Sequence, residues 1–270
     1  MKWRLPRFNP WKTPYPLPKD TASILMEQGG NSDNFGLYLD RLLAYGERRG
    51  SLELLREFAN RRALTAEYVS QKDLIAALNR RWRALSRRLR AVTFTARPEW
   101  RILIGKAGHK ILGADIAIHP VHGIPWIPAT SLKGVTRLYA EAVADAPEDM
   151  VTHLFGASKE KGETQGDLIF LDAIPLGAPV IERDVINPHW SVYYGGSDYT
   201  PAADLLSPKP VFMMAIGKAN RFLFGVASVS NDAAAVEQGA DWLQRSLVEI
   251  GVGAKSASGY GYWVIENEHG

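Results

Sequence analysis

The spacing of apolar residues divides the chain at about residue 90. Between residues 34 and 90 apolar side chains recur at helical intervals, which predicts a helical region. Residues 91–265 contain β-branched and alternating runs together with two amphipathic stretches, which predicts strands and helices within one domain. Residues 1–33 combine prolines with interleaved aromatic residues and therefore predict an extended arm rather than a helix.

The elements expected in residues 91–265 follow the order strand, helix, strand, strand, helix, strand. This order predicts an α+β fold of the ferredoxin-like type, with an antiparallel sheet and helices on one face. The apolar runs at 211–216 and 222–229 flank a short polar segment and predict a hairpin. RNA-recognition modules share this plan, although a fold alone does not establish a function.

A long segment at about 177–207 interrupts the predicted domain. It is rich in Pro, Gly, Tyr and Asp, and loops of this length are usually functional in compact domains. We therefore expect an insertion. Tyr193 and Tyr194 could offer stacking faces to RNA bases. His189 follows Asp184 by five residues and could act as an acid or base in a metal-independent ribonuclease.

Charge is distributed unevenly around a net value of +3. Residues 1–110 hold 22 Lys and Arg against 10 Asp and Glu, whereas residues 111–270 hold 10 against 19. This asymmetry favours a basic region that binds a polyanion, although an arginine-rich helix can also be an ordinary solvated face. The chain has no cysteine and no long apolar run, so we expect a cytoplasmic protein without disulfides, thiolate metal sites or contact with a membrane.

Six arginines fall between residues 80 and 90 of the predicted helical region. At helical spacing four of them share one face, namely Arg80, Arg83, Arg87 and Arg90. Guanidinium groups bind phosphate oxygens in a bidentate manner, so this face is a candidate for RNA contact. Trp82 lies among the arginines, where we expect packing rather than stacking on a base.

The glycine-rich segment Gly251–Gly261 lies between the last predicted helix and the last predicted strand. Its small side chains suit a close approach of backbone amides to phosphates, and Lys255 adds a positive charge. A Walker loop is excluded by Ala254, and a dinucleotide fingerprint fails at Ser256. Glycines that merely allow a sharp turn are the alternative. We expect the segment to bind RNA backbone through Gly253, Lys255, Ser256 and Ser258.

A second candidate anion site lies at the start of the first helix of the domain. Thr130 or Ser131 could cap this helix, leaving free amides at its positive end. Lys133 follows in the first turn and Arg137 one turn later. A capped helix with ordinary surface cations is the alternative, but the pairing of this helix start with the glycine-rich segment Gly251–Gly261 favours RNA binding by Ser131, Lys133 and Arg137.

The histidines do not form a recognisable metal or catalytic motif. His119 and His122 are three residues apart in a loop broken by proline, and no acidic motif accompanies them. We therefore expect no metal, no cofactor and no catalytic residue.

Two of these segments resemble the RAMP superfamily of CRISPR effector proteins. Residues 125–134, Pro-Trp-Ile-Pro-Ala-Thr-Ser-Leu-Lys-Gly, are similar to the stretch that leads into the first helix of that family, with Ala129 and Thr130 in place of Gly and Ser. The glycine-rich segment with its Tyr-Gly-Tyr ending, together with residues 184–189 and the following tyrosines, looks like the sixth subunits of type III-B Cmr complexes. The resemblance covers roughly residues 91–265.

The resemblance implies a subunit of an RNA-guided, RNA-targeting antiviral complex, positioned near the 3′ end of the guide. Its implied partners are the CRISPR guide RNA, the target RNA, the RAMP backbone and capping subunits, and the small helical subunits. The implied role is non-catalytic, because in this family the repeated backbone subunit cuts the target. An endoribonuclease that processes CRISPR transcripts through His189 or a tyrosine is the alternative.

Overall fold

The computed structural model describes residues 34, 45–48, 51–54, 71–105, 116–157, 162, 164–186 and 211–266. Within these ranges no helix is long and apolar enough to cross a membrane. The predicted arm at residues 1–33 lies outside the described part of the chain, as do residues 187–207 of the predicted insertion.

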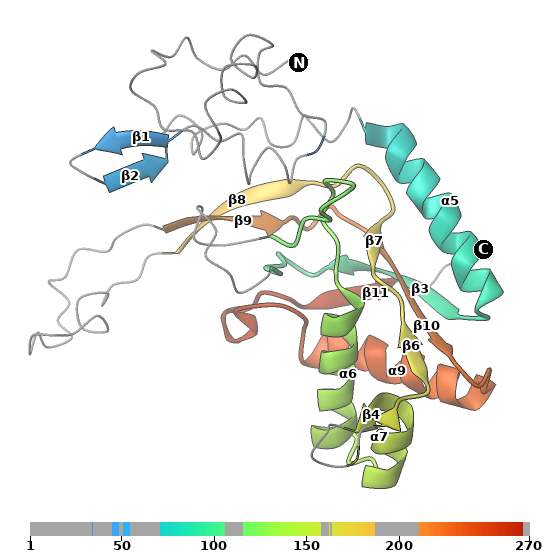
Figure 1. Ribbon diagram of the computed structural model, residues 1–270. Coiled ribbons are helices and arrows are strands. Elements are labelled where there is room, and N and C mark those ends of the chain that lie inside the picture. Colours follow the sequence, from blue (N-terminus) through green and yellow to red (C-terminus); the bar gives the residue numbers. More distant parts are fainter. Residues whose placement is uncertain are drawn as a thin grey trace, which may run out of the picture.

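An antiparallel sheet lies at the centre of the described structure (Figure 1). Its strands run in the spatial order β11-β3-β10-β6, with the short β7 paired to the start of β10. The strands are β3 (Val92–Pro98), β6 (Leu168–Phe170), β7 (Ile174–Pro175), β10 (Phe222–Ser228) and β11 (Trp263–Glu266). Helices α6 (Ala129–Ala142) and α9 (Ala233–Glu249) follow β3 and β10 along the chain. The order β3-α6-β6-β10-α9-β11 confirms the predicted α+β, ferredoxin-like fold.

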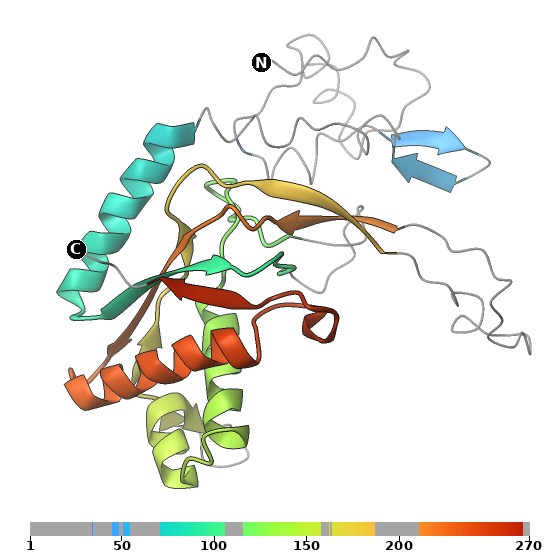
Figure 2. The ribbon, with the colours of Figure 1, turned by 180° about the vertical axis from the view of Figure 1, so that it is seen from behind.

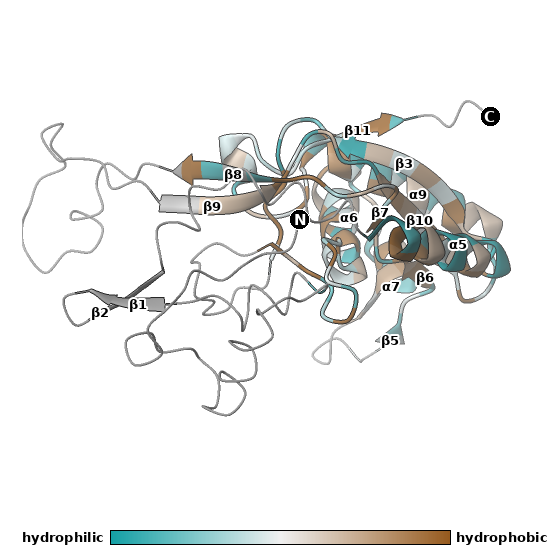
Figure 3. Ribbon diagram, turned by 90° about the horizontal axis from the view of Figure 1, so that it is seen from above, coloured by the Kyte–Doolittle hydropathy of each residue, from teal (hydrophilic) through white to brown (hydrophobic). Residues whose placement is uncertain are grey.

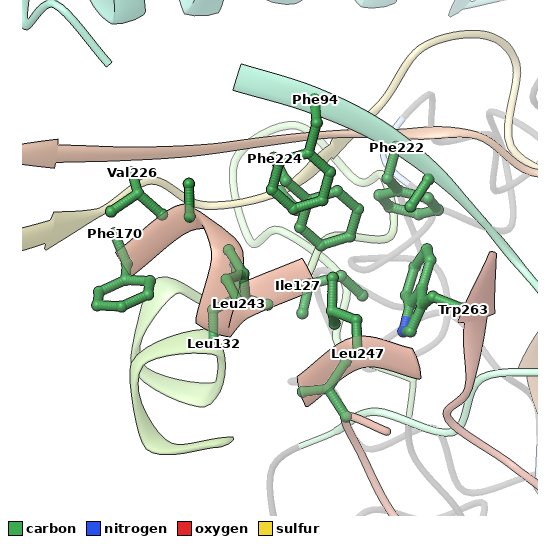
Figure 4. Close-up of a cluster of buried hydrophobic side chains, with 14 of the residues drawn as sticks. Phe94, Ile127, Leu132, Phe170, Phe222, Phe224, Val226, Leu243, Leu247 and Trp263 are labelled. Carbon is green, nitrogen blue, oxygen red and sulfur yellow. The ribbon is translucent and has the colours of Figure 1, made fainter. Parts of the chain in front are cut away.

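Strand β10 is buried along its whole length because both faces of the sheet are covered. Phe222, Phe224 and Val226 point toward α6 and α9, where they meet Leu243, Leu247 and Trp263 (Figure 4). The intervening Leu223 and Gly225 face the opposite side, where they meet Trp82. Trp82 belongs to α5 (Lys72–Arg88), which lies across the sheet from α6 and α9 in Figures 1 and 2.

The two helices of the predicted domain, α6 and α9, lie on one face of the sheet, as expected, and α5 of the predicted helical region covers the other face. Helix α5 presents a stripe of Ile75, Asn79, Trp82 and Ser86 at spacings of four, three and four residues, and all four are buried. RNA-recognition modules stack bases on an open sheet face. Here α5 covers that face, so it is not available to RNA.

The aromatic core fixes the register of the central strands. Phe94 and Phe224 stand opposite each other on β3 and β10, and their rings stack with centroids 5.2 Å apart. The Trp263 ring meets Phe224 edge-on, with a centroid separation of 5.1 Å. A slip of one residue would turn each of these rings to the other face.

The helical prediction for residues 34–90 holds at α5 but is wrong at residues 45–48 and 51–54. Strands β1 (Tyr45–Arg48) and β2 (Ser51–Leu54) pair antiparallel there. The run Ser-Leu-Glu-Leu in β2 alternates polar and apolar residues, which is the period of a strand. The division of the chain into an arm, a helical region and one domain stays a prediction.

The predicted hairpin of residues 211–216 and 222–229 is also wrong. Strand β9 (Val211–Ile216) pairs with β8 (Ile181–Ile186), while β10 belongs to the central sheet. The buried Asn220 holds the crossing point, because its side chain bonds the amide and carbonyl of Val180 and the carbonyl of Gly217. The expected insertion thus begins with a strand, β8.

The remaining elements lie at the end of α6. Helix α7 (Glu148–Phe155) leads into β4 (Gly156–Ala157), which pairs with β5 (Thr164–Gln165). Helix α9 is capped by Asp232, whose carboxylate accepts from the amides of Ala234 and Ala235.

Candidate nucleic-acid interface

The glycine-rich segment, Gly251–Gly261, is fastened to the stretch of chain that follows β3. The Ala254 amide donates to the Leu103 carbonyl at 2.7 Å, and the Gly261 amide donates to the Arg101 carbonyl at 3.0 Å. Val252 donates to the Gly261 carbonyl and closes the base of the segment. The segment is therefore a docked loop with a defined path, and we call it the glycine loop.

Glycine is required where the loop approaches residue 103. Gly253 has a φ of 118°, and a Cβ atom at this position would overlap the Leu103 carbonyl oxygen. Gly259 has a φ of 86°, but open space surrounds it. Gly253 thus allows the loop to dock against residue 103, whereas Gly259 serves only the turn.

The tip of the glycine loop presents unpaired backbone amides. Lys255 adopts the left-handed conformation with a φ of 62°, and a short 3₁₀ turn, Ser256–Ser258, follows it. The amides of Lys255, Ser256 and Ala257 donate to no acceptor among the described residues, whereas those of Ser258 and Gly259 are used inside the turn. Consecutive free amides in such a turn form a concavity that binds anions. The exposed Lys255 side chain adds charge beside them.

Tyr260 anchors the far side of this tip. Its ring is 5% exposed and packs with Leu103, Met213 and Ala215. Its hydroxyl donates to the Asp184 carboxylate on β8 at 2.6 Å. Burial together with this carboxylate raises the pKa of Tyr260 to about 12.

Arg101 completes a polar cluster around Asp184. Its guanidinium donates to Glu182 at 2.7 Å and to Asp184 at 3.0 Å. Burial alone would raise the pKa of Asp184, but bonds from Tyr260, the Val185 amide and Arg101 outweigh it and lower that pKa. The cluster joins β8, the segment after β3 and the glycine loop.

The start of α6 differs from the predicted anion site. The helix begins at Ala129, so Thr130 and Ser131 lie inside it rather than at the cap. The Ala129 amide donates to the carboxylate of Asp172 at 2.7 Å, and the Ser131 amide donates to the Pro128 carbonyl. A negative side chain therefore already occupies the positive end of the helix.

Lys133 and Arg137 line a separate cavity of about 560 Å³ with Phe155, Gly156 and Gln165, and no residue of the glycine loop lines it. Arg137 is engaged there, because it donates to Glu141 at 2.7 Å and to the Gly156 carbonyl at 3.1 Å. Lys133 makes no ion pair with any described residue. Of these two cations, Lys133 is the better placed to bind phosphate.

The arginines of α5 divide between solvent and packing. Arg80, Arg81, Arg87 and Arg88 are exposed and pair with no acidic side chain in the described ranges. Arg83 is half-buried. Figure 3 shows α5 largely in the hydrophilic colour on the outside of the molecule.

One expectation about α5 is wrong and another is confirmed. Arg90 does not share the face of Arg80 and Arg87, because α5 ends at Arg88 and Arg90 has a φ of 52°. Trp82 packs, as expected: it is 7% exposed and donates to the Asp172 carbonyl.

The remaining candidates are two tyrosines and the histidines. His189, Tyr193 and Tyr194 lie outside the described residues, so their roles stay predictions. His119 and His122 stack with ring centroids 4.4 Å apart. No group of three or more metal-ligating side chains occurs among the described residues.

Sequence reasoning did not identify Arg101 and Glu182 as parts of the candidate interface. Both residues are far in sequence from the glycine loop and from each other, and no local motif marks them. Tyr260 was noticed only as part of a motif shared with a family, and Asp184 only there and as a neighbour of His189 in sequence.

A ferredoxin-like sheet with a docked glycine-rich loop before its last strand defines the class of this domain. The family model of the RAMP superfamily matches residues 104–264, which is more than half of the chain. The chain belongs to the RAMP superfamily.

Two curated relatives carry more particular names. The chain is similar to the CRISPR system Cmr subunit Cmr6 of Pyrococcus furiosus, with 26% identity over 235 residues, 64% of this chain and 67% of the relative. It is also similar to the CRISPR system CMR subunit Cmr6 of Saccharolobus solfataricus, with 28% identity over 174 residues, 63% of this chain and 56% of the relative. The resemblance to sixth Cmr subunits is confirmed.

Among solved structures the chain is similar to one from the type III-B Cmr-beta complex bound to cognate target RNA. The TM-score is 0.58 at 24% identity, and the match covers 71% of this chain and 65% of that one. This likeness shows the fold. The chain spans between about half and two thirds of the length of these relatives.

Proposed function

We propose that this protein is a non-catalytic, guide-RNA-binding subunit of a type III-B CRISPR effector complex that targets RNA in antiviral defence. Membership of the RAMP superfamily and the two Cmr6 relatives support the assignment to such a complex. The role in RNA binding rests on the geometry of the glycine loop.

The observation that carries the proposal is the row of free amides at Lys255, Ser256 and Ala257. An RNA phosphate offers anionic oxygens to such a row at low steric cost, because the loop side chains are small. The contact joins protein backbone amides to the RNA phosphate backbone and does not involve the bases, so it suits an RNA of any sequence. This is the requirement on a protein that holds guides of many sequences.

The outer face of α5 is a second surface for the polyanion. Its four exposed arginines, which pair with no acidic side chain among the described residues, can each neutralise a phosphate. Lys133 offers a third contact at its cavity. These surfaces lie at different places on the domain, so we propose that an extended RNA, rather than a mononucleotide, is the ligand.

The partners we propose are the guide RNA, the target RNA and the other Cmr subunits. The position near the guide's 3′ end is what the family resemblance implies. The β8–β9 pair, tied to the glycine loop through Asp184, is the element that we expect to reach the guide–target duplex and the next subunit.

The test is the salt dependence of binding between the full-length chain and a short single-stranded RNA. Lys255→Ala should weaken binding and reduce the slope of log K against log salt by about 0.7, the value for one phosphate contact on a single strand. Lys218→Ala is the matched control, since Lys218 is an exposed lysine outside the proposed interface. Equal slopes for both variants would contradict the proposal.

A guide-precursor RNA, incubated with the purified protein, tests the non-catalytic role. The protein should leave it intact. Cleavage that disappears in His189→Ala would assign an endoribonuclease function instead.

A further inference from the structure

Trp100 is a large aromatic residue at the surface beside the glycine loop. It is 43% exposed. The residues on either side of it bond the loop, because the Glu99 amide donates to the Tyr262 carbonyl at 2.9 Å and the Arg101 carbonyl accepts from Gly261. The position of its backbone relative to the loop is therefore fixed.

The Trp100 ring rests on a rigid support. Its centroid lies 4.9 Å from that of Tyr260, with 38° between the planes, and the Arg101 guanidinium carbon lies 5.0 Å from its centroid. Tyr260 and Arg101 both bond the same oxygen of Asp184, so their polar ends meet at one point. Because both supports of the indole are held by this carboxylate, the Trp100 ring loses little conformational entropy when a ligand covers it.

The support also links the ring to the free amides. The Tyr260 amide donates to the Lys255 carbonyl at 3.3 Å, within the turn that presents the amides of Lys255 to Ala257. An apolar face and an anion-binding turn thus stand on one small unit. A nucleotide has these two parts: a flat base and a phosphate.

We propose that Trp100 is a stacking platform for one unpaired base of the RNA whose backbone the glycine loop holds. The inference rests on the proposed RNA-binding function and adds a base contact to it. Stacking on an aromatic ring tolerates any base, which agrees with a guide of variable sequence. It also requires that the base be unpaired at this point, so guide and target would not pair here.

The experiment is a cycle between the protein and the RNA. The full-length chain, as wild type and as Trp100→Ala, is titrated with a short single-stranded RNA and with copies that carry one abasic nucleotide at successive positions. We expect Trp100→Ala to weaken binding of the intact RNA about tenfold, within the range measured for base stacking, with no change in salt slope. We also expect one abasic position to weaken the wild type by a similar factor and to leave Trp100→Ala unaffected.

Three further variants serve as controls. Leu138→Ala removes an apolar side chain that is 49% exposed on α6, away from the loop, and should leave binding unchanged. Trp100→Phe keeps an aromatic face and should recover most of the affinity, whereas Trp100→Leu should not, even where Trp100→Ala is too unstable to use.

Equal affinities for wild type and Trp100→Leu, or an abasic profile identical in both, would overturn the inference while leaving the RNA-binding function intact. The same holds if Trp100→Leu weakens only assembly with other subunits, which would make Trp100 a protein contact. Failure of the wild-type chain to bind any of the RNAs would instead refute the proposed function itself.

Discussion

Tyr260 and Asp184 are 76 residues apart in sequence and share a 2.6 Å hydrogen bond that fastens the glycine loop to β8. Tyr260 is the largest buried side chain of the glycine loop. A loop with several residues at positive φ has many alternatives when it is free. We therefore expect this bond to determine how well the loop is ordered before RNA arrives.

Tyr260→Phe keeps the ring and removes the hydroxyl. Because the acceptor is a carboxylate, we expect a loss of about 1.5–3 kcal/mol in the free energy of unfolding, measured with urea. Tyr139→Phe is the matched control. Tyr139 is equally buried and also donates to a carboxylate, that of Glu249, but at 3.4 Å, so it should cost less. Equal losses would show that the short bond adds nothing particular.

Acidic pH should weaken the hydrogen bond between Tyr260 and Asp184. The pKa of Asp184 is lower in the folded chain than in the unfolded one, so the folded state favours the ionised carboxylate. Its stabilisation is therefore complete above the unfolded value of about 3.9 and is lost as pH falls through the folded pKa. Asp184→Asn should reduce the loss of stability on acidification relative to wild type.

Asp167 is the comparison for this pH effect. Its carboxylate accepts from Ser228 at 2.6 Å and from Ser230, and its pKa is also lowered, against the opposing effect of burial. Asp167→Asn should alter the acid response of stability in the same direction but leave RNA affinity unchanged. If both asparagine variants lowered RNA affinity equally, the special role of Asp184 would be refuted.

Alanine substitutions at two glycines separate the effect of docking of the glycine loop from the effect of backbone strain. Gly253→Ala and Gly259→Ala both place a Cβ at positive φ, but only the first meets the Leu103 carbonyl oxygen. We expect Gly253→Ala to lower RNA affinity and to speed hydrogen exchange at the Ala254 amide, whereas Gly259→Ala should show only the cost of strain, about 1 kcal/mol. The same exchange rate in both variants would contradict docking as the cause.

The arginines of α5 should contribute to binding by charge alone. The double variant Arg80→Ala, Arg87→Ala should reduce the salt slope of RNA binding by about 0.7 for each phosphate contact removed. Arg245→Ala is the control, because that exposed arginine is already paired with Asp241. No difference in slope between the two variants would mean that α5 faces solvent or protein.

The central fold was predictable because its signals are local. Each strand and helix of the βαββαβ order shows its own periodicity, and Asp232 marks the start of α9 where a cap is expected. The glycine loop was predictable for the same reason, since glycines, serines and one lysine stand together. Its anchor was not, because Arg101, Asp184 and Tyr260 meet only after the chain has folded.

The errors have a common physical origin in tertiary context. The segment at 217–220 reads as a hairpin turn, but buried bonds from Asn220 direct the two strands into different sheets. Ser131 stands where a cap is expected, but Asp172 from another part of the chain takes that position. Arg90 continues the arginine pattern in sequence although the helix has ended two residues earlier.

The most direct test of the central claim is crosslinking of RNA to protein in the native complex, purified through this chain, followed by mapping of the crosslinked residues. Our account predicts a short bound RNA with crosslinks in residues 251–261 and at Trp100. A complex without short RNA, or crosslinks that avoid the glycine loop, would contradict it.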